Sequence, residues 1–181
     1  MTRAMVVVAA VSLCALGCNG PGGRVEPLDV RGCPSGGDVV HATDVIGRPP
    51  PSGYVVDPGR KQVLKGVAEQ FKPTLGDSWR GYDAKVLVRK GERSGAAVIV
   101  INSDDETVSR DEDLARGFEK GAEQRGVAAE KIVIGGREGR MVPTADGGYI
   151  AMASTGQCAV VLLVADEAPL VRDAASVIPK P

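Results

Sequence analysis

The side chains best suited to hold a metal ion follow an apolar run in the middle of the chain. Asn102, Asp104 and Glu106 alternate there, with Asp105 between them. Oxygen ligands at this spacing are typical of a calcium-binding loop. However, Thr107 stands where an EF-hand needs glycine, and no helix is predicted before the loop. We therefore interpret these acids as the lead-in to a helix, whose N-terminus favours negative charge.

Two further segments could support chemistry. Two arginines stand among glycines in the segment Gly135–Arg140, where backbone amides could cradle an anion. Because this segment lacks the spacing of a P-loop or of a dinucleotide-binding fingerprint, a bend between strands is the simpler interpretation. The single histidine, His41, could form a metal or acid–base site with Asp44, but both lie in a Gly- and Pro-rich stretch where a solvated histidine is expected. The sequence therefore predicts no catalytic residue, no metal ligand and no cofactor.

Composition limits the range of partners. Lys and Arg number 22 and Asp and Glu number 23, so no strong field attracts nucleic acid, and we expect none as a partner. Aromatic residues make up only 3% of the chain. Large rings dominate interface energetics, so Trp79 and Tyr82 are the candidate partner contacts if they are exposed. Packing of these two rings into the core is the alternative.

The first seventeen residues have the composition of a secretion signal. Arg3 precedes a largely apolar run from Ala4 to Leu16, which is too short to span a bilayer, because crossing needs about 20 apolar residues. The run ends in the sequence Leu13-Cys14-Ala15-Leu16-Gly17-Cys18. This ending resembles the lipobox of bacterial exported lipoproteins.

The resemblance covers only this end of the chain, and it implies a location and an anchor. It implies that residues 1–17 are removed and that Cys18 is lipidated. Two or three acyl chains hold a protein firmly, so membrane lipid is the expected partner of Cys18, on the extracytoplasmic face of the cell membrane. The alternative is an ordinary secretory signal that is cut nearby; both alternatives export the protein.

A flexible tether and a disulfide are expected next. Residues 18–56 are rich in Gly and Pro and are predicted to be a tether. Cys14 leaves with the signal, and under the lipoprotein resemblance Cys18 carries lipid. Cys33 and Cys158 then remain as one pair in an oxidising compartment, which predicts a disulfide between them. The alternative is one buried thiol and one loose one.

Residues 57–181 are predicted to form a single α+β domain. Consecutive hairpins in its second half favour a largely antiparallel sheet with helices packed on one face. The strand, helix, strand order from Ala96 to Ile134 leaves a parallel crossover, and hence an α/β fold, as the alternative. A capping box at Ser109 and Glu112 predicts the start of a helix, and Gly126 predicts its end. Strands are expected at residues 82–88, 96–101, 132–134, 140–142, 149–153 and 158–165, and further helices at 57–72 and 168–178.

Three functions fit these features. The leading hypothesis is a lipid-tethered, non-enzymatic envelope module that binds a partner or ligand. A small extracytoplasmic hydrolase using carboxylates such as Asp104 and Asp105 is the rival, and a structural or assembly factor is the third. An exposed apolar patch near Trp79 favours partner binding. Paired carboxylates with raised pKa values at the floor of a pocket favour the enzyme.

Overall fold

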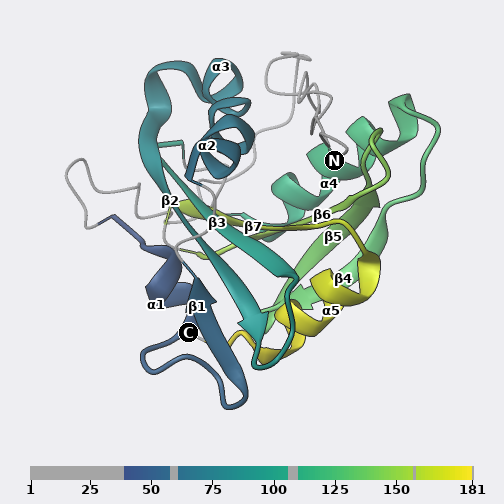
Figure 1. Ribbon diagram of the computed structural model, residues 1–181. Coiled ribbons are helices and arrows are strands. Elements are labelled where there is room, and N and C mark those ends of the chain that lie inside the picture. Colours follow the sequence, from purple (N-terminus) through teal and green to yellow (C-terminus); the bar gives the residue numbers. More distant parts are fainter. Residues whose placement is uncertain (1–38, 58–60, 106–109, 157, 181) are drawn as a thin grey trace, which may run out of the picture.

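An antiparallel sheet forms the centre of the molecule (Figure 1). The structure is a computed structural model that describes residues 39–57, 61–105, 110–156 and 158–180. Within these residues seven strands form one sheet in the order β1-β2-β3-β7-β6-β5-β4. The strands are β1 (Tyr54–Asp57), β2 (Trp79–Arg89), β3 (Gly95–Ser103), β4 (Glu130–Ile134), β5 (Arg137–Pro143), β6 (Tyr149–Ser154) and β7 (Ala159–Ala165). The helices are α1 (Ala42–Ile46), α2 (Lys61–Glu69), α3 (Lys72–Leu75), the 3₁₀ helix η1 (Gly76–Ser78), α4 (Asp111–Gln124) and α5 (Ala168–Val177).

The pairing of the strands confirms the α+β class. Every pair of neighbouring strands is antiparallel. The chain leaves β3 through α4, begins again at the far edge with β4, and returns strand by strand until β7 pairs with β3. Strands β3 and β4 therefore run the same way, but three strands separate them. The parallel crossover that the order of elements left open does not produce a parallel pair.

Helices cover both faces of the sheet, which corrects the expected single helical layer. Val98 and Val100 of β3 belong to the core cluster under α1 and α5. Ile99 and Ile101 belong to the cluster under α2 and α4. Because successive side chains of a strand point to opposite faces, a central strand that is apolar at every position must be covered twice. Figure 1 shows α1 and α5 on one side of the sheet and α2 and α4 on the other.

The described residues 39–56 are part of the folded domain, which corrects the predicted tether over its last part. Ala42 and Ile46 of α1 are fully buried, and Tyr54 of β1 is 8% exposed. Strand β1 pairs with β2 along its whole length. The prolines between α1 and β1 turn the chain back toward the sheet instead of extending it away from the domain. The predicted signal, Cys18 and the rest of the predicted tether, residues 1–38, lie outside the described residues.

The boundaries of α4 agree with the sequence at one end only. The helix begins at Asp111, with Arg110 at the N-cap position, one residue later than predicted. Ser109 lies outside the described residues, so its capping box stays a prediction. Acidic residues fill its first turn, where the helix dipole favours them. Gly126, with a φ of 69°, ends the helix as predicted. Throughout the described ranges, no helix combines the length and the apolar character needed to cross a membrane.

Candidate functional site

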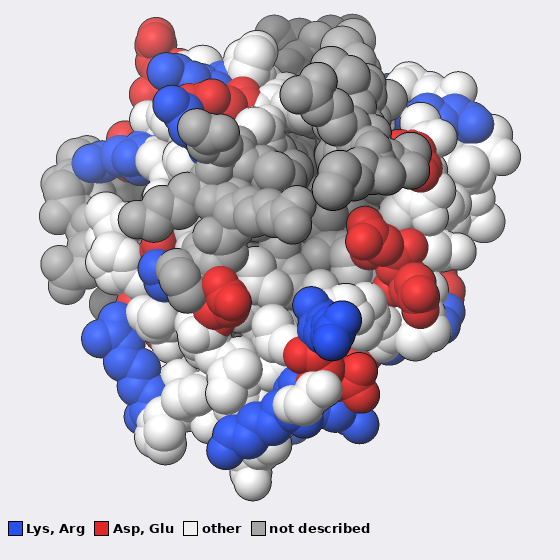
Figure 2. Space-filling model, in the orientation of Figure 1, with Lys and Arg blue, Asp and Glu red and all other residues white. Residues whose placement is uncertain are grey.

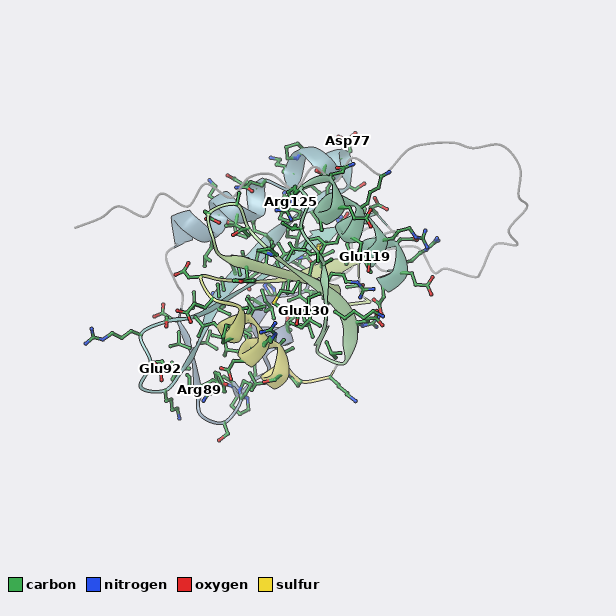
Figure 3. The ribbon with its side chains drawn as sticks, turned by 90° about the vertical axis from the view of Figure 1, so that its right-hand side faces the viewer. Asp77, Arg89, Glu92, Glu119, Arg125 and Glu130 are labelled. Carbon is green, nitrogen blue, oxygen red and sulfur yellow. The ribbon has the colours of Figure 1, made fainter. Side chains whose placement is uncertain are left out.

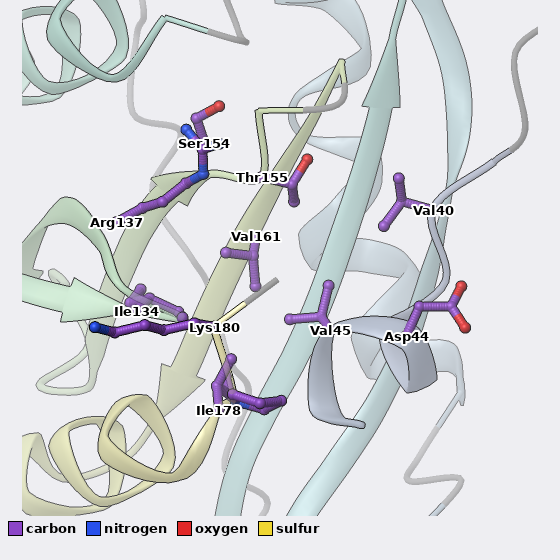
Figure 4. A pocket seen from close by; sticks show the side chains of 12 residues that line it. Val40, Asp44, Val45, Ile134, Arg137, Ser154, Thr155, Val161, Ile178 and Lys180 are labelled. Carbon is purple, nitrogen blue, oxygen red and sulfur yellow. The ribbon is translucent and has the colours of Figure 1, made fainter. Parts of the chain in front are cut away.

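An open pocket of about 310 Å³ lies on the side of the sheet that α1 and α5 cover (Figure 4). Segments far apart in the sequence meet there: the start of the domain, the β4–β5 turn, the adjoining parts of β6 and β7, and the tail after α5. Concave sites of this size and larger are typical of small-molecule binding. The lining residues are Val40, Asp44, Val45, Ile134, Gly135, Arg137, Ser154, Thr155, Val161, Ile178, Pro179 and Lys180.

The tail after α5 forms one wall because two glycines make room for it. Gly135 and Gly136 have φ values of 59° and 79° and form the turn between β4 and β5. A Cβ atom on Gly136 would lie 2.8 Å from Cγ of Lys180, and one on Gly135 would lie 3.1 Å from the carbonyl oxygen of Pro179. The predicted bend between strands is confirmed. The tail lies against this turn, at the place where the sequence left open a cradle for an anion.

Polar contacts hold the opposite wall to the sheet. The side chain of Asn102 clamps the backbone of Val40: its Oδ1 accepts from the amide at 2.9 Å, and its Nδ2 donates to the carbonyl at 3.1 Å. Oδ2 of Asp83 accepts from the amide of Ala42, at the start of α1, at 2.9 Å. These bonds fix Val40 and Val45 beside the pocket. Asn102, considered above as a calcium ligand, is a buried backbone clamp.

The interior of the pocket is apolar. In Figure 4 the side chains of Val45, Ile134, Val161 and Ile178 face the space between the walls. The carboxylate of Asp44 points away from it. That carboxylate lies 3.0 Å from Nη2 of Arg48 and accepts from the amide of His41 at 3.0 Å. The negative charge of Asp44 is therefore balanced by Arg48, outside the pocket.

One corner of the pocket carries hydrogen-bond donors. Nη1 of Arg137 lies 3.4 Å from each carboxylate oxygen of Asp111, and its Nε is buried with no hydrogen-bond partner among the described residues. The guanidinium lies against Gly156, because a Cβ atom there would be 2.1 Å from Nη2. The amide of Gly156 donates to Oγ of buried Ser154 at 2.9 Å. Arg137, Gly156 and Ser154 thus lie together, and we call these three residues the polar corner.

In the sequence, Arg137 belongs to a segment that allowed an anion cradle but was better explained as a bend between strands. Its neighbours in the folded chain are Asp111 at the start of α4 and Gly156 after β6. Neither neighbour is close to it in the sequence, and an arginine among glycines gives no local signal that distinguishes a pocket wall from a turn. The fold brings together the start of α4, the start of β5 and the turn after β6.

A second open pocket, of about 410 Å³, lies near the β2–β3 turn and the start of α5. The hydroxyl of Tyr54 donates to Oδ2 of Asp173 at 2.7 Å, and Nη2 of Arg89 donates to the Tyr54 oxygen at 3.2 Å and to Oδ1 of Asp173. Burial, followed by the bond to Asp173, raises the pKa of Tyr54. Figure 3 shows Arg89 and Glu92 at this end. Because these three groups satisfy one another, they tie β1, β2 and α5 together.

The acidic segment after β3 is used within the fold. Oδ1 of Asp104 lies 2.5 Å from Nε of Arg80. The amide of Asp105 donates to Oγ of Ser103 at 3.0 Å. Glu106 lies outside the described residues. In the part of the chain that the structure describes, no group of three or more His, Cys, Asp or Glu residues is placed to hold a metal ion.

The remaining candidate residues lie away from the pocket interior. Nδ1 of exposed His41 is 3.6 Å from Oδ2 of Asp83, close enough for an ion pair when the ring is protonated. The rings of Trp79 and Tyr82 lie 6.4 Å apart, half-buried against the core under α2. This position agrees with the packing alternative, and a contact with a partner stays a prediction.

The predicted disulfide falls partly outside the described residues. Cys158, the one cysteine among the described residues, has a φ of 58° in the turn before β7. Its carbonyl accepts from the amide of Ser103 at 2.9 Å. Cys33 lies outside the described residues, so its pairing with Cys158 stays a prediction.

Charges of both signs are interspersed over the face in Figure 2, in keeping with the near-equal totals of basic and acidic residues. No protein-family model matches the sequence, and no curated protein or solved structure matches it. Functional conclusions therefore depend on the chemistry of the leader and of the pocket.

Proposed function

We propose that this chain is an exported lipoprotein, held on the extracytoplasmic face of a cell membrane through acylated Cys18, and that its domain is a non-enzymatic binding module. The observation that carries the binding role is the open pocket of about 310 Å³ beside α1, whose walls are apolar and whose donors gather at one corner. Apolar walls with a few convergent polar groups are the usual design of a small-molecule site.

The position of the pocket suits a tethered protein. Val40 lines the pocket, so the described part of the chain begins beside it. Residues 19–38 separate Cys18 from the first described residue. Even fully extended, twenty residues span at most about 70 Å. A domain anchored at Cys18 therefore holds its pocket within that distance of the bilayer.

Metabolic labelling tests the anchor. The wild type, Cys18→Ala and Cys14→Ala are expressed in a bacterium fed an alkyne fatty acid, and the label on each purified protein is measured. We expect label on the wild type and on Cys14→Ala, because Cys14 leaves with the signal, and none on Cys18→Ala. An unlabelled wild type, or equal label on Cys18→Ala, contradicts the anchor.

Titration with a neutral fluorescent ligand tests the pocket. N-phenylnaphthylamine, which is apolar and uncharged, is titrated into the wild type, Val45→Phe and Val133→Phe. Val45 faces the pocket, whereas Val133 is exposed on edge strand β4, so the second variant adds the same bulk elsewhere. We expect saturable binding by the wild type and Val133→Phe, weakened about tenfold or more in Val45→Phe. The absence of saturable binding by the wild type contradicts the proposal.

A further inference from the structure

We infer that the ligand of this pocket is a free fatty acid of about ten carbons, held with its carboxylate at Arg137 and its chain between α1 and the tail after α5. The inference rests on the binding function proposed above. It names the charge, the length and the orientation of the ligand.

Part of the Arg137 guanidinium lacks a hydrogen-bond acceptor among the described residues. Its Nε is buried and has no partner among the described residues, and its Nη1 reaches Asp111 only at 3.4 Å, whereas charged N–H···O bonds are usually about 2.7 to 2.9 Å long. Ser154 accepts through Oγ from Gly156, which leaves its own O–H able to donate. A carboxylate accepts hydrogen bonds only, and its two oxygens match the fork of a guanidinium.

The charges around the pocket favour an anion over a cation. Among the described residues of the lining, Arg137 and Lys180 are the basic ones and Asp44 is the one acid. The Asp44 carboxylate points away from the pocket and lies beside Arg48. Asp111 is the other acid in contact with this group, and it faces Arg137 from α4. An ammonium head group at the same corner would meet Arg137 with no free carboxylate to compensate for it.

The pocket volume gives the length of chain that the walls can cover. A water molecule occupies about 30 Å³ of liquid, so about 310 Å³ holds on the order of ten groups of that size. Val45, Val161 and Ile178 line the space below the polar corner in Figure 4. Such walls favour a methylene chain, because each buried CH₂ contributes about 0.8 kcal/mol.

Displacement of bound N-phenylnaphthylamine tests the charge of the ligand. Decanoate, decan-1-ol, decylamine and decyl phosphate share one chain and differ only in the head group. We expect decanoate to displace the dye from the wild type at a concentration about tenfold or more below that of decan-1-ol, and decylamine to be weakest. The preference for decanoate should shrink as salt is added, because the contact is partly exposed.

Variants of Arg137 assign the contact. Arg137→Gln should bring decanoate to the level of decan-1-ol, both compared with that variant's own dye affinity, and Arg137→Lys should keep part of the preference. Arg116→Gln, on the exposed side of α4, makes the same change elsewhere and should leave both affinities unchanged. Ser154→Ala should weaken decanoate binding without affecting the alcohol.

Four results overturn this inference. If the dye binds but decanoate displaces it no better than decan-1-ol, the pocket exists and its ligand is not an anion. If decyl phosphate binds more tightly than decanoate, the head group is not a carboxylate. If Arg116→Gln changes the preference as much as Arg137→Gln does, the effect is one of overall charge. If Arg137→Gln does not fold, a smaller preference for decanoate in Ser154→Ala than in the wild type supports the polar corner, and an unchanged preference overturns it.

Discussion

Glycines beside the pocket lack a side chain, and other parts of the chain occupy the space this leaves. Gly135 and Gly136 admit the tail after α5, and Gly156 admits the guanidinium of Arg137. The turns themselves could be predicted from the sequence, because adjacent glycines and Thr-Gly pairs favour turns locally. Their second role could not be predicted, because the atoms that fill the space come from residues distant in the chain.

Substitution of Gly156 should be costly for two reasons that act together. Its φ is 74°, and a Cβ atom would lie 2.1 Å from Nη2 of Arg137. We expect Gly156→Ala to lower the free energy of unfolding by about 1 to 3 kcal/mol. Gly66, in the exposed part of α2 with no atom near its Cβ position, is the matched control, and Gly66→Ala should stabilise by about 0.5 to 1 kcal/mol. Urea denaturation measures both, and equal effects would refute the assignment.

Tyr54 should make stability depend on pH in alkaline solution. Burial and the bond to Asp173 raise its pKa in the folded state, so the stability it contributes is present below its unfolded pKa of about 10 and is lost as pH rises through the folded value. At neutral pH, Tyr54→Phe should cost about 1 kcal/mol, the typical value of one hydrogen bond. Between about pH 8 and pH 11 the variant should lose less stability than the wild type. Parallel losses in urea denaturation would show that Tyr54 does not contribute.

At the scale of elements, long periodic segments could be predicted and short ones could not. The alternation in β2 and the unbroken apolar runs of β3 and β7 predicted these strands correctly. The same unbroken apolar runs indicate that helices cover both faces of the sheet. The consecutive hairpins instead favoured a sheet with helices on one face. Helix α1 and strand β1 have five and four residues, too few for periodicity to distinguish them from a loop.

Arg140 connects α4 to the sheet, and its removal should show how much this contact contributes. Its side chain, 9% exposed, donates to Glu119 of α4 at 2.5 Å, to Glu138 at 2.7 Å and to the carbonyl of Gly139 at 2.9 Å. We expect Arg140→Ala to destabilise by about 2 to 3 kcal/mol, through lost charged hydrogen bonds and lost packing.

The matched control is Arg116→Ala, at an exposed position of α4. Its free energy of unfolding should stay within about 0.5 kcal/mol of the wild type. Thermal and urea denaturation measure both variants. A loss at Arg140 no larger than that at Arg116 would mean that the buried guanidinium does not hold the helix in place.

At the scale of the whole molecule, composition misplaced the boundary of the domain. Residues rich in Gly and Pro were interpreted as tether as far as residue 56, but α1 and β1 lie within that stretch. Ile46 is fully buried and Tyr54 nearly so, against strands that follow much later in the chain. Composition describes local flexibility, whereas membership of a core depends on contacts that only the fold makes.

Two fragments test this boundary. Residues 39–181 contain α1 and β1, and residues 57–181, the boundary predicted from composition, do not. We expect the longer fragment to unfold cooperatively. The shorter one should lose about 3 kcal/mol or more, because it uncovers the surface that Ile46 and Tyr54 bury. Equal free energies of unfolding in urea would show that the domain boundary is at residue 57. Neither fragment contains Cys33, so a disulfide between Cys33 and Cys158 does not affect the comparison.

The most direct test of the binding function is a map of amide chemical shifts during a titration with decanoate. Two-dimensional nitrogen–proton spectra of the uniformly labelled domain should show saturable shifts at Val45, Arg137, Thr155 and Val161, which line the pocket on separate segments. The amides of Trp79 and Arg89, on the other side of the core and at the second pocket, should stay in place. An unchanged spectrum, or shifts confined to Trp79 and its neighbours, would contradict a binding module built around this pocket.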